Sequence, residues 1–397
     1  MHYIRFLKLP KAEVKPGTIL VKSIITITTD LGETFYPTDL DLIATLRSSS
    51  DEGEIHLRRR IPWPAHARSL PITFYLSRQQ DVDWPACVHV AVQNPTTTGT
   101  ANPPPGFLPE IVDIWSGLLN PPQGLLDSGQ RVERRFLSLA ERSVSLLEDA
   151  GDSIARHLWD GSQVLAQYID HTISVQTPAS PLPLLEHVLV SATYRRLHVL
   201  ELGCGCGSVG ISVAQSIPDC DVLLTDLPEV TELVEANVAR MKPAMSSQVT
   251  FAPLDWEVSL PETLQNRTND LIIVSECTYN TDTLSPLVTT LVNLLARSPK
   301  AVIVVSTKTR HPSEAGFFDM MRDAGIVEAG AARSPLPGLP GDGYADAAMD
   351  VGLYVFCGEE RGLSMSPRGG GERKVVEGGQ GGEEDEGEVG GCSRCPF

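Results

Sequence analysis

The chain has 397 residues, of which 42% are hydrophobic, and a formal net charge of -18 at pH 7. This length can bury an extensive core and hold two domains and a tail. The acidic charge disfavours a nucleic-acid partner, since proteins that bind phosphate backbones present a basic face. No apolar stretch is long enough to span a bilayer, the first residues lack the order of a signal peptide, and the 8 cysteines are scattered. We therefore expect a monomeric protein of the cytoplasm or the nucleus, with neither a membrane nor a nucleic acid as partner.

Residues 1–120 predict a β-rich module. Short runs rich in Ile, Val and Thr, separated by Pro and Gly, lie at 18–29, 40–46, 55–57, 72–76 and 87–92. Recurring short strands without a helical period are typical of a small sandwich or barrel. Trp63 and Trp84 could form a recognition surface or close the core of this module, and we favour the core.

Residues 121–154 predict a helical connector. Apolar or small residues recur there at helical spacing, with Arg and Glu on the opposite side, which is typical of an amphipathic helix. The residues on the apolar side are Val132, Phe136, Leu139, Ser143 and Leu147. A second helix is expected after Gly161, and it carries Val164, Leu165, Tyr168 and Ile169.

A glycine-rich turn follows the apolar run at 197–202. Gly203, Gly205 and Gly207 separate this run from a helical pattern. Glycines let the backbone adopt positive φ and approach a ligand, and a helix N-terminus offers unpaired N–H groups. The next apolar run, at 222–224, leads to Asp226, a carboxylate placed to accept hydrogen bonds from both hydroxyls of a ribose. This corner predicts a nucleotide-like cofactor.

Two later strands end in polar and aromatic residues. The run 249–254 leads into Asp255 and Trp256, and an indole suits stacking on a flat base. The run 270–275 leads into Glu276 and, three residues on, Tyr279. Because ligands of an open α/β sheet lie beyond the carboxyl ends of its strands, this acid and this tyrosine are expected to face the site.

Two cofactor classes fit the glycines. The pattern Gly-x-Gly-x-x-Gly from Gly205 formally matches the dinucleotide fingerprint. The stretch Glu-Leu-Gly-x-Gly-x-Gly from Glu201 resembles motif I of the class I, seven-stranded methyltransferases that use S-adenosylmethionine (SAM). Three further features resemble motifs of the family 16 protein-lysine methyltransferases and their methyltransferase-like 21 group. They are the Leu-Asp-Trp at 254–256, the acid-x-x-Tyr at 276–279 and Trp159. The chain resembles a fungal-type member of that family with an N-terminal extension, although the family has Asp where Glu276 stands.

The resemblance implies a Rossmann-like α/β fold with a seven-stranded sheet in residues 155–357. It implies that SAM is the cofactor, that Glu276 and Tyr279 orient a substrate lysine, and that no metal takes part. The residues that it implies for cofactor binding are Trp159, Glu201, Gly203, Gly205, Gly207, Asp226, Leu227, Asp255, Trp256 and Ser275.

Three functions stay open at this point. Methylation of a protein lysine is favoured, because the acid-x-x-Tyr motif resembles that family and an acidic surface suits a lysine-presenting partner. The alternatives are methylation of a histidine, a protein N-terminus or a small molecule, or a non-catalytic SAM-binding protein. The Gly- and Glu-rich residues 358–397 are predicted to be a disordered tail, and its Cys392 and Cys395 lack the further ligands of a zinc site.

Overall fold

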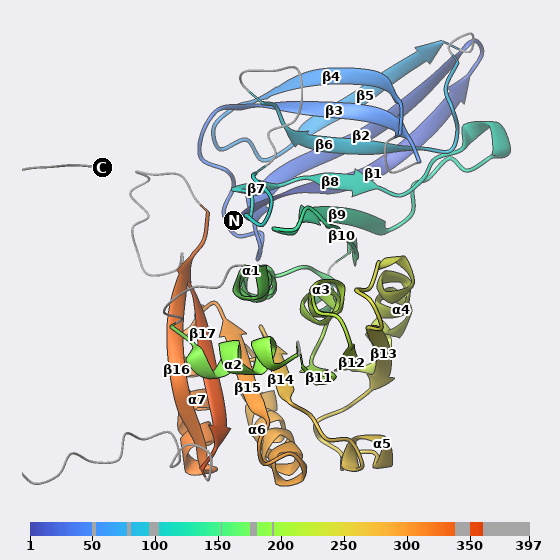
Figure 1. Ribbon diagram of the computed structural model, residues 1–397. Helices are drawn as coiled ribbons and strands as arrows, with labels where there is room; N and C mark the ends of the chain where they lie inside the picture. Colours follow the sequence, from blue (N-terminus) through green and yellow to red (C-terminus); the bar gives the residue numbers. More distant parts are fainter. Residues whose placement is uncertain are drawn as a thin grey trace, which may run out of the picture.

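The computed structural model describes residues 1–49, 53–77, 81–94, 103–151, 153–174, 181–192, 194–337 and 350–359. These residues form an N-terminal β-sandwich that packs on an α/β domain (Figure 1). No helix in this part of the chain has the length and apolarity needed to span a bilayer. The predicted tail from residue 360 on, with Cys392 and Cys395, lies outside the described residues.

Two sheets that share one hydrophobic core make up the sandwich. The first has the strand order β5-β2-β1-β7 and the second β10-β9-β8-β6-β3-β4. The expected β-rich module is confirmed, and Trp63, with 1% of its surface exposed, lies in its core. The strands are β1 (His2–Lys15), β2 (Thr18–Thr29), β3 (Leu40–Ser48), β4 (Ile55–Trp63), β5 (Leu70–Ser77), β6 (Ala86–Val92), β7 (Ile111–Val112), β8 (Ile114–Ser116), β9 (Arg131–Leu137) and β10 (Ser143–Asp149), with a 3-10 turn η1 (Pro121–Gln123).

The helix predicted across residues 132–147 is wrong. These residues form the antiparallel hairpin β9–β10, which closes one edge of the six-stranded sheet. Their buried face includes Arg134 and Glu148, an ion pair with an Nε to Oε1 distance of 2.8 Å. Because charged residues occupy inward-facing positions, the alternation typical of a strand is hidden, and the remaining apolar residues happen to fit a helical period.

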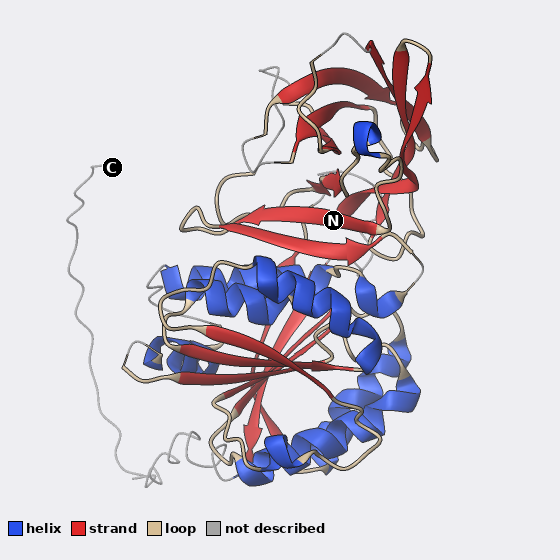
Figure 2. Cartoon of the chain, turned by 90° about the vertical axis from the view of Figure 1, so that its right-hand side faces the viewer, coloured by secondary structure: helices blue, strands red, loops and turns tan. Residues whose placement is uncertain are grey.

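The α/β domain is built on the predicted seven-stranded sheet. Its order is β13-β12-β11-β14-β15-β17-β16, parallel except for β17, which is antiparallel to both of its neighbours. Helices cover both faces of this sheet (Figure 2). The strands are β11 (Leu197–Leu202), β12 (Cys220–Asp226), β13 (Gln248–Pro253), β14 (Leu271–Ser275), β15 (Val302–Thr307), β16 (Ile326–Pro335) and β17 (Asp350–Gly358). The helices are α1 (Asp160–Ser174), α2 (Pro183–Ser191), α3 (Ser208–Ser216), α4 (Thr231–Arg240), α5 (Glu262–Gln265), α6 (Thr281–Arg297) and α7 (Gly316–Asp323), with 3-10 turns η2 (Ile154–Arg156), η3 (Pro228–Val230) and η4 (Pro312–Ala315).

One apolar core crosses the boundary between the two domains. Tyr3 of β1 and Leu146 of β10 belong to the same buried cluster as Val164 of α1 and Val199 of β11. Helix α1 lies between the sandwich and the sheet (Figure 1). Asn237 of α4 adds polar contacts, because its side chain accepts from the backbone N–H of β10 residue Leu147 and donates to that residue's carbonyl. The sandwich is therefore packed directly against the part of the chain that holds the predicted site.

Candidate active site

A cavity of about 580 Å³ opens beyond the carboxyl ends of strands β11, β12 and β14. This is the place where open α/β sheets bind their ligands, and the volume lies within the range of cofactor sites. Of the predicted site residues, all but Glu201 and Gly207 line it; those that do are Trp159, Gly203, Gly205, Asp226, Leu227, Asp255, Trp256, Ser275, Glu276 and Tyr279.

The turn after β11 needs its glycines. Gly203 and Gly205 have φ of 63° and 53°, in the left-handed region. A Cβ atom on Gly203 would lie 2.5 Å from the Cys277 sulfur, and one on Gly205 would lie 3.0 Å from the carbonyl oxygen of Ala155. A side chain at either position would therefore strain the backbone and press on the cavity wall.

Asp226 connects this turn to the end of β12. Its Oδ2 atom accepts from the Gly205 N–H and its Oδ1 atom from the Leu227 N–H, both at 2.7 Å. Burial raises the pKa of this carboxyl. Each carboxylate oxygen has a second lone pair, so Asp226 keeps acceptor capacity toward the cavity that it lines.

Glu201 and Gly207 shape the turn from behind the cavity. Glu201 is 1% exposed, and its Oε2 atom accepts from the Gly210 N–H at 2.8 Å, which ties β11 to the first turn of α3. Burial raises the pKa of Glu201 to about 8, so the carboxyl is protonated at neutral pH. Gly207 precedes α3 with φ of 76°.

Two tryptophans line the cavity. The indole N–H of Trp159 donates to the Ile154 carbonyl at 3.0 Å, which fixes the ring. The indole nitrogen of Trp256 is buried, with no hydrogen-bond partner among the described residues. A buried donor without a partner carries a desolvation cost, which a bound ligand can relieve.

Glu276 and Tyr279 both reach the cavity but differ in setting. Glu276 is 7% exposed and has φ of 56°, and its Oε1 atom accepts from the Gly161 N–H at 2.8 Å. Its Oε2 atom accepts from Arg310 at 2.5 Å. Burial raises the pKa of Glu276 to about 7, and Arg310 partly offsets this effect. Tyr279 is 50% exposed, so its hydroxyl is the more accessible of the two groups.

Cys277 and Ser275 complete this wall. Burial raises the pKa of the Cys277 thiol well above its usual value, so this thiol stays protonated and is no nucleophile. The hydroxyl of Ser275 lies 2.9 Å from the hydroxyl of Ser162 and 2.8 Å from that of Ser306. No cluster of metal-binding side chains occurs in the described part of the chain.

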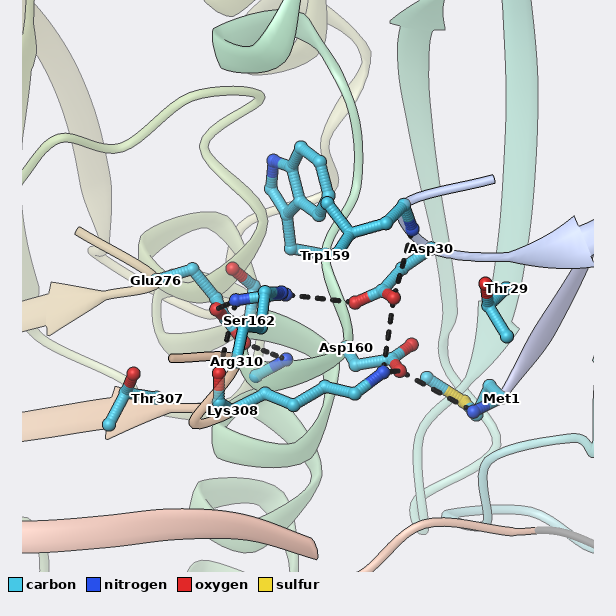
Figure 3. A network of polar contacts seen from close by, with 12 residues as sticks. Met1, Thr29, Asp30, Trp159, Asp160, Ser162, Glu276, Thr307, Lys308 and Arg310 are labelled. Atoms are coloured by element: carbon cyan, nitrogen blue, oxygen red, sulfur yellow. Dashed lines mark hydrogen bonds and ion pairs between the residues drawn. The ribbon is translucent and has the colours of Figure 1, made fainter. Parts of the chain in front are cut away.

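Sequence reasoning missed a polar network beside Glu276. Asp30, Asp160, Lys308 and Arg310 come together there from the sandwich, from α1 and from the turn after β15 (Figure 3). The one sequence signal was the polar turn at 307–310. Nothing local connects it to Asp30, which is 280 residues away in the chain.

The comparisons agree with this geometry. Residues 138–324 match the model of a family described as lysine methyltransferase. These residues, a little under half of the chain, therefore carry a methyltransferase domain that is similar to this family. Over most of its length this methyltransferase is similar to a UPF0665 family protein of Schizosaccharomyces pombe, with 29% identity over 80% of this chain and 91% of the relative.

Relatives with assigned activities match a smaller part of the methyltransferase. Protein-lysine N-methyltransferase rrg1 of Schizosaccharomyces pombe is 30% identical over 33% of this chain and 46% of its own length. Protein-lysine N-methyltransferase EFM6 of Saccharomyces cerevisiae is 24% identical over 45% of this chain and 74% of its own length.

SAM is the cofactor of this methyltransferase, and the cavity fits it. Among the described residues, five acidic side chains and no Lys or Arg line the cavity, which suits a ligand with a positively charged sulfonium. The glycine turn lets the backbone approach closely, Asp226 has acceptor capacity for ribose hydroxyls, and Trp256 offers an aromatic face and an unpartnered N–H.

Proposed function

We propose that this protein is a SAM-dependent methyltransferase that transfers a methyl group to the side-chain amine of a lysine in another protein. The observation that carries the proposal is one acidic cavity shared by the cofactor residues and by Glu276 and Tyr279, in a chain whose residues 138–324 match the model of a lysine methyltransferase family. The named protein-lysine methyltransferases among its relatives support the choice of a lysine.

Bound SAM would supply a methyl group on a sulfonium: a neutral amine would bond to the methyl carbon in line as the carbon–sulfur bond breaks, and S-adenosylhomocysteine would leave as a neutral thioether. The chain's own contribution is to hold donor and acceptor in contact, which accounts for most of the acceleration in such reactions. The carboxylates that line the cavity attract a charged lysine. Desolvation inside the cavity then favours loss of its proton to solvent, because burial disfavours the charged form of an amine.

Tyr279 and Glu276 orient the amine in this proposal. The half-exposed Tyr279 hydroxyl can accept from or donate to the incoming nitrogen. Glu276 is held by Gly161 and Arg310 and has a remaining lone pair on each oxygen. It therefore acts as a fixed acceptor rather than as a mobile base.

We extend the proposal to the enzyme's partner, oligomeric state and compartment. The partner is a protein that presents a lysine, and neither a membrane nor a nucleic acid takes part, since a net charge of -18 repels phosphate backbones and anionic surfaces. The enzyme acts as a monomer in the cytoplasm or the nucleus. Free thiols occur at Cys87, Cys204, Cys206, Cys220 and Cys277, in keeping with a reducing compartment.

The test is incubation of the purified protein with methyl-tritiated SAM and a lysate of its source organism. Gly205→Arg is the inactive variant, since its side chain would enter the cofactor turn. Gly17→Arg is the matched control, because Gly17 has a similar positive φ of 77° with nothing within 4 Å of an added Cβ atom.

We expect a protein band labelled by the wild type and by Gly17→Arg but not by Gly205→Arg, with methyl-lysine after hydrolysis. Label on histidine or on an α-amine would move the assignment to another acceptor. SAM binding without any labelled protein would favour a small-molecule acceptor or a non-catalytic role.

A further inference from the structure

We propose that Asp30 of the β-sandwich is a positioning residue of the methyltransferase site and acts on Glu276 and Trp159 through Arg310. The N-terminal domain is then part of the catalytic apparatus and not an appended module. This inference rests on the proposed function, since it takes Trp159 and Glu276 to serve SAM and the acceptor amine.

Arg310 joins the two domains at the wall of the cavity. Its NH1 nitrogen donates to Glu276 at 2.5 Å and its NH2 nitrogen donates to Asp30 at 2.9 Å. Its guanidinium carbon lies 5.5 Å from the ring centroid of Trp159, a cation–π distance (Figure 3). One planar cation thus contacts two residues that line the cavity and one from the sandwich.

Asp30 is itself firmly held. Its side chain is 1% exposed and accepts from Lys308 at 3.0 Å in addition to Arg310. Lys308 also donates to Asp160 at 2.8 Å, and the Tyr3 hydroxyl donates to the other oxygen of Asp160 at 2.8 Å. Residues of the sandwich therefore contact both the turn after β15 and the start of α1, next to Trp159.

Glu276 needs such restraint. Its positive φ is uncommon for a residue with a long side chain and persists only where the surroundings fix it. A Cβ atom on Gly161 would lie 2.2 Å from its Oε1 atom, so the carboxylate occupies space that only a glycine at position 161 leaves open. Without Asp30, Arg310 would lose one of its two anchoring carboxylates, and both Glu276 and Trp159 would lose a fixed neighbour.

The test measures binding of S-adenosylhomocysteine (SAH) by calorimetry, because this readout does not depend on the acceptor. Asp30→Asn keeps the shape of the side chain and removes its charge. Asp41→Asn is the matched control: Asp41 lies in the same domain and also pairs with an arginine, Arg60, but at an exposed position. Circular dichroism and melting temperature establish that each variant is folded.

We expect Asp30→Asn to weaken SAH binding by about tenfold, within the usual range of coupling between sites, and Asp41→Asn to leave it unchanged. In a chain that already carries Arg310→Gln, Asp30→Asn should add no further loss, because the effect passes through Arg310. If Asp30→Asn instead weakened SAH binding by destabilising the whole protein, its loss of affinity would add to the loss caused by Arg310→Gln. If Asp30→Asn fails to fold, Asp30→Glu takes its place, because it keeps the charge and moves it by one methylene. This variant should lose less SAH affinity, and again no further affinity in the chain that carries Arg310→Gln.

SAH affinity of Asp30→Asn within twofold of wild type, or losses that multiply in the double variant, would overturn the inference. A wild-type chain that binds SAH but labels no protein would refute the lysine assignment alone. The comparison of Asp30→Asn with wild type would still stand in that case.

Discussion

At the scale of single residues, Glu276 and Tyr279 share a motif but not an environment. Glu276 is closed in by Gly161 and Arg310, whereas Tyr279 is half-exposed at the cavity. Burial raises the pKa of the Tyr279 hydroxyl, which therefore stays protonated over the range in which enzymes are assayed. Tyr279 can thus orient an amine by hydrogen bonds without changing its charge.

Replacing Tyr279 with Phe should slow methyl transfer by roughly 10- to 100-fold, the scale of one lost orienting contact, with SAM affinity unchanged. The ring remains, so the cavity keeps its shape and only the hydroxyl is lost. Single-turnover rates on the identified substrate, together with calorimetry for SAM, would measure both effects. A parallel loss of SAM affinity would show that the residue is structural.

Replacing Glu201 with Gln should change how stability depends on pH. The Glu201 carboxyl keeps its proton in the fold up to a pKa of about 8, but in the unfolded chain it ionises near 4.5. Between these values the folded state binds the additional proton, so wild-type stability falls by about 1.4 kcal/mol per pH unit as pH rises. The amide of the Glu201→Gln variant carries no such proton, and its carbonyl can still accept from Gly210.

Urea unfolding at about pH 5, 6.5 and 8 would test this. The difference in unfolding free energy between wild type and Glu201→Gln separates the effect of Glu201 from that of other titrating groups. Glu262→Gln, at an exposed position, is the matched control. A difference that stays constant over this range would contradict a protonated Glu201.

At the scale of elements, the β9–β10 hairpin shows where sequence patterns stop being sufficient. Most strands of the large sheet were predictable, because they are short apolar runs followed by a turn. Strand β16, in which Ile326 is the one buried residue, lacks such a run. The hairpin was not predictable, because Arg134 and Glu148 face inward. Charged residues are read as solvent-exposed, and only a partner 14 positions away makes their burial tolerable.

Removing one member of this pair should destabilise the hairpin strongly. Burial opposes ionisation of Glu148, but Arg134 and His157 outweigh it and hold the pKa of Glu148 well below its usual range. Arg134→Met leaves that charge buried without its arginine partner, which should cost roughly 3–5 kcal/mol of unfolding free energy. Adding Glu148→Gln removes the charge and keeps an acceptor for the Leu158 N–H, so the double variant should regain part of the loss.

Denaturant unfolding of the four proteins of this cycle gives the coupling energy directly. Destabilisations that simply add would mean that the two side chains do not depend on each other. Glu148 accepts a hydrogen bond from the backbone N–H of Leu158, which precedes Trp159 in the chain. We therefore also expect Arg134→Met to weaken SAM binding.

At the scale of the whole molecule, the sandwich and the α/β domain share a core and a polar network. Most of the predicted residues that line the cavity end or follow a strand of one sheet, which made them predictable from the sequence. Trp159 precedes α1 instead, and only the resemblance to known methyltransferases indicated it. The contribution of Asp30 was not, because no local pattern reports a contact between residues 30 and 310. Long-range contacts between domains depend on how the folded surfaces meet, and a motif describes only its own neighbourhood.

The shared core predicts that the two domains open together. Leu146 of the sandwich and Val164 of the α/β domain lie in one buried cluster, so unfolding either domain exposes the other's apolar surface. SAH would bind in the cavity alone, but at a hundred times its dissociation constant it should stabilise the whole cooperative unit by about 2.7 kcal/mol.

Native-state hydrogen exchange followed by mass spectrometry would compare peptides from β2 and β15 with and without SAH. Equal gains in protection are expected, since a ligand that binds only the folded state stabilises every amide whose exchange requires global unfolding. Protection gained in β15 but not in β2 would mean that the sandwich opens independently and that contacts such as those of Asp30 are too weak to couple the domains.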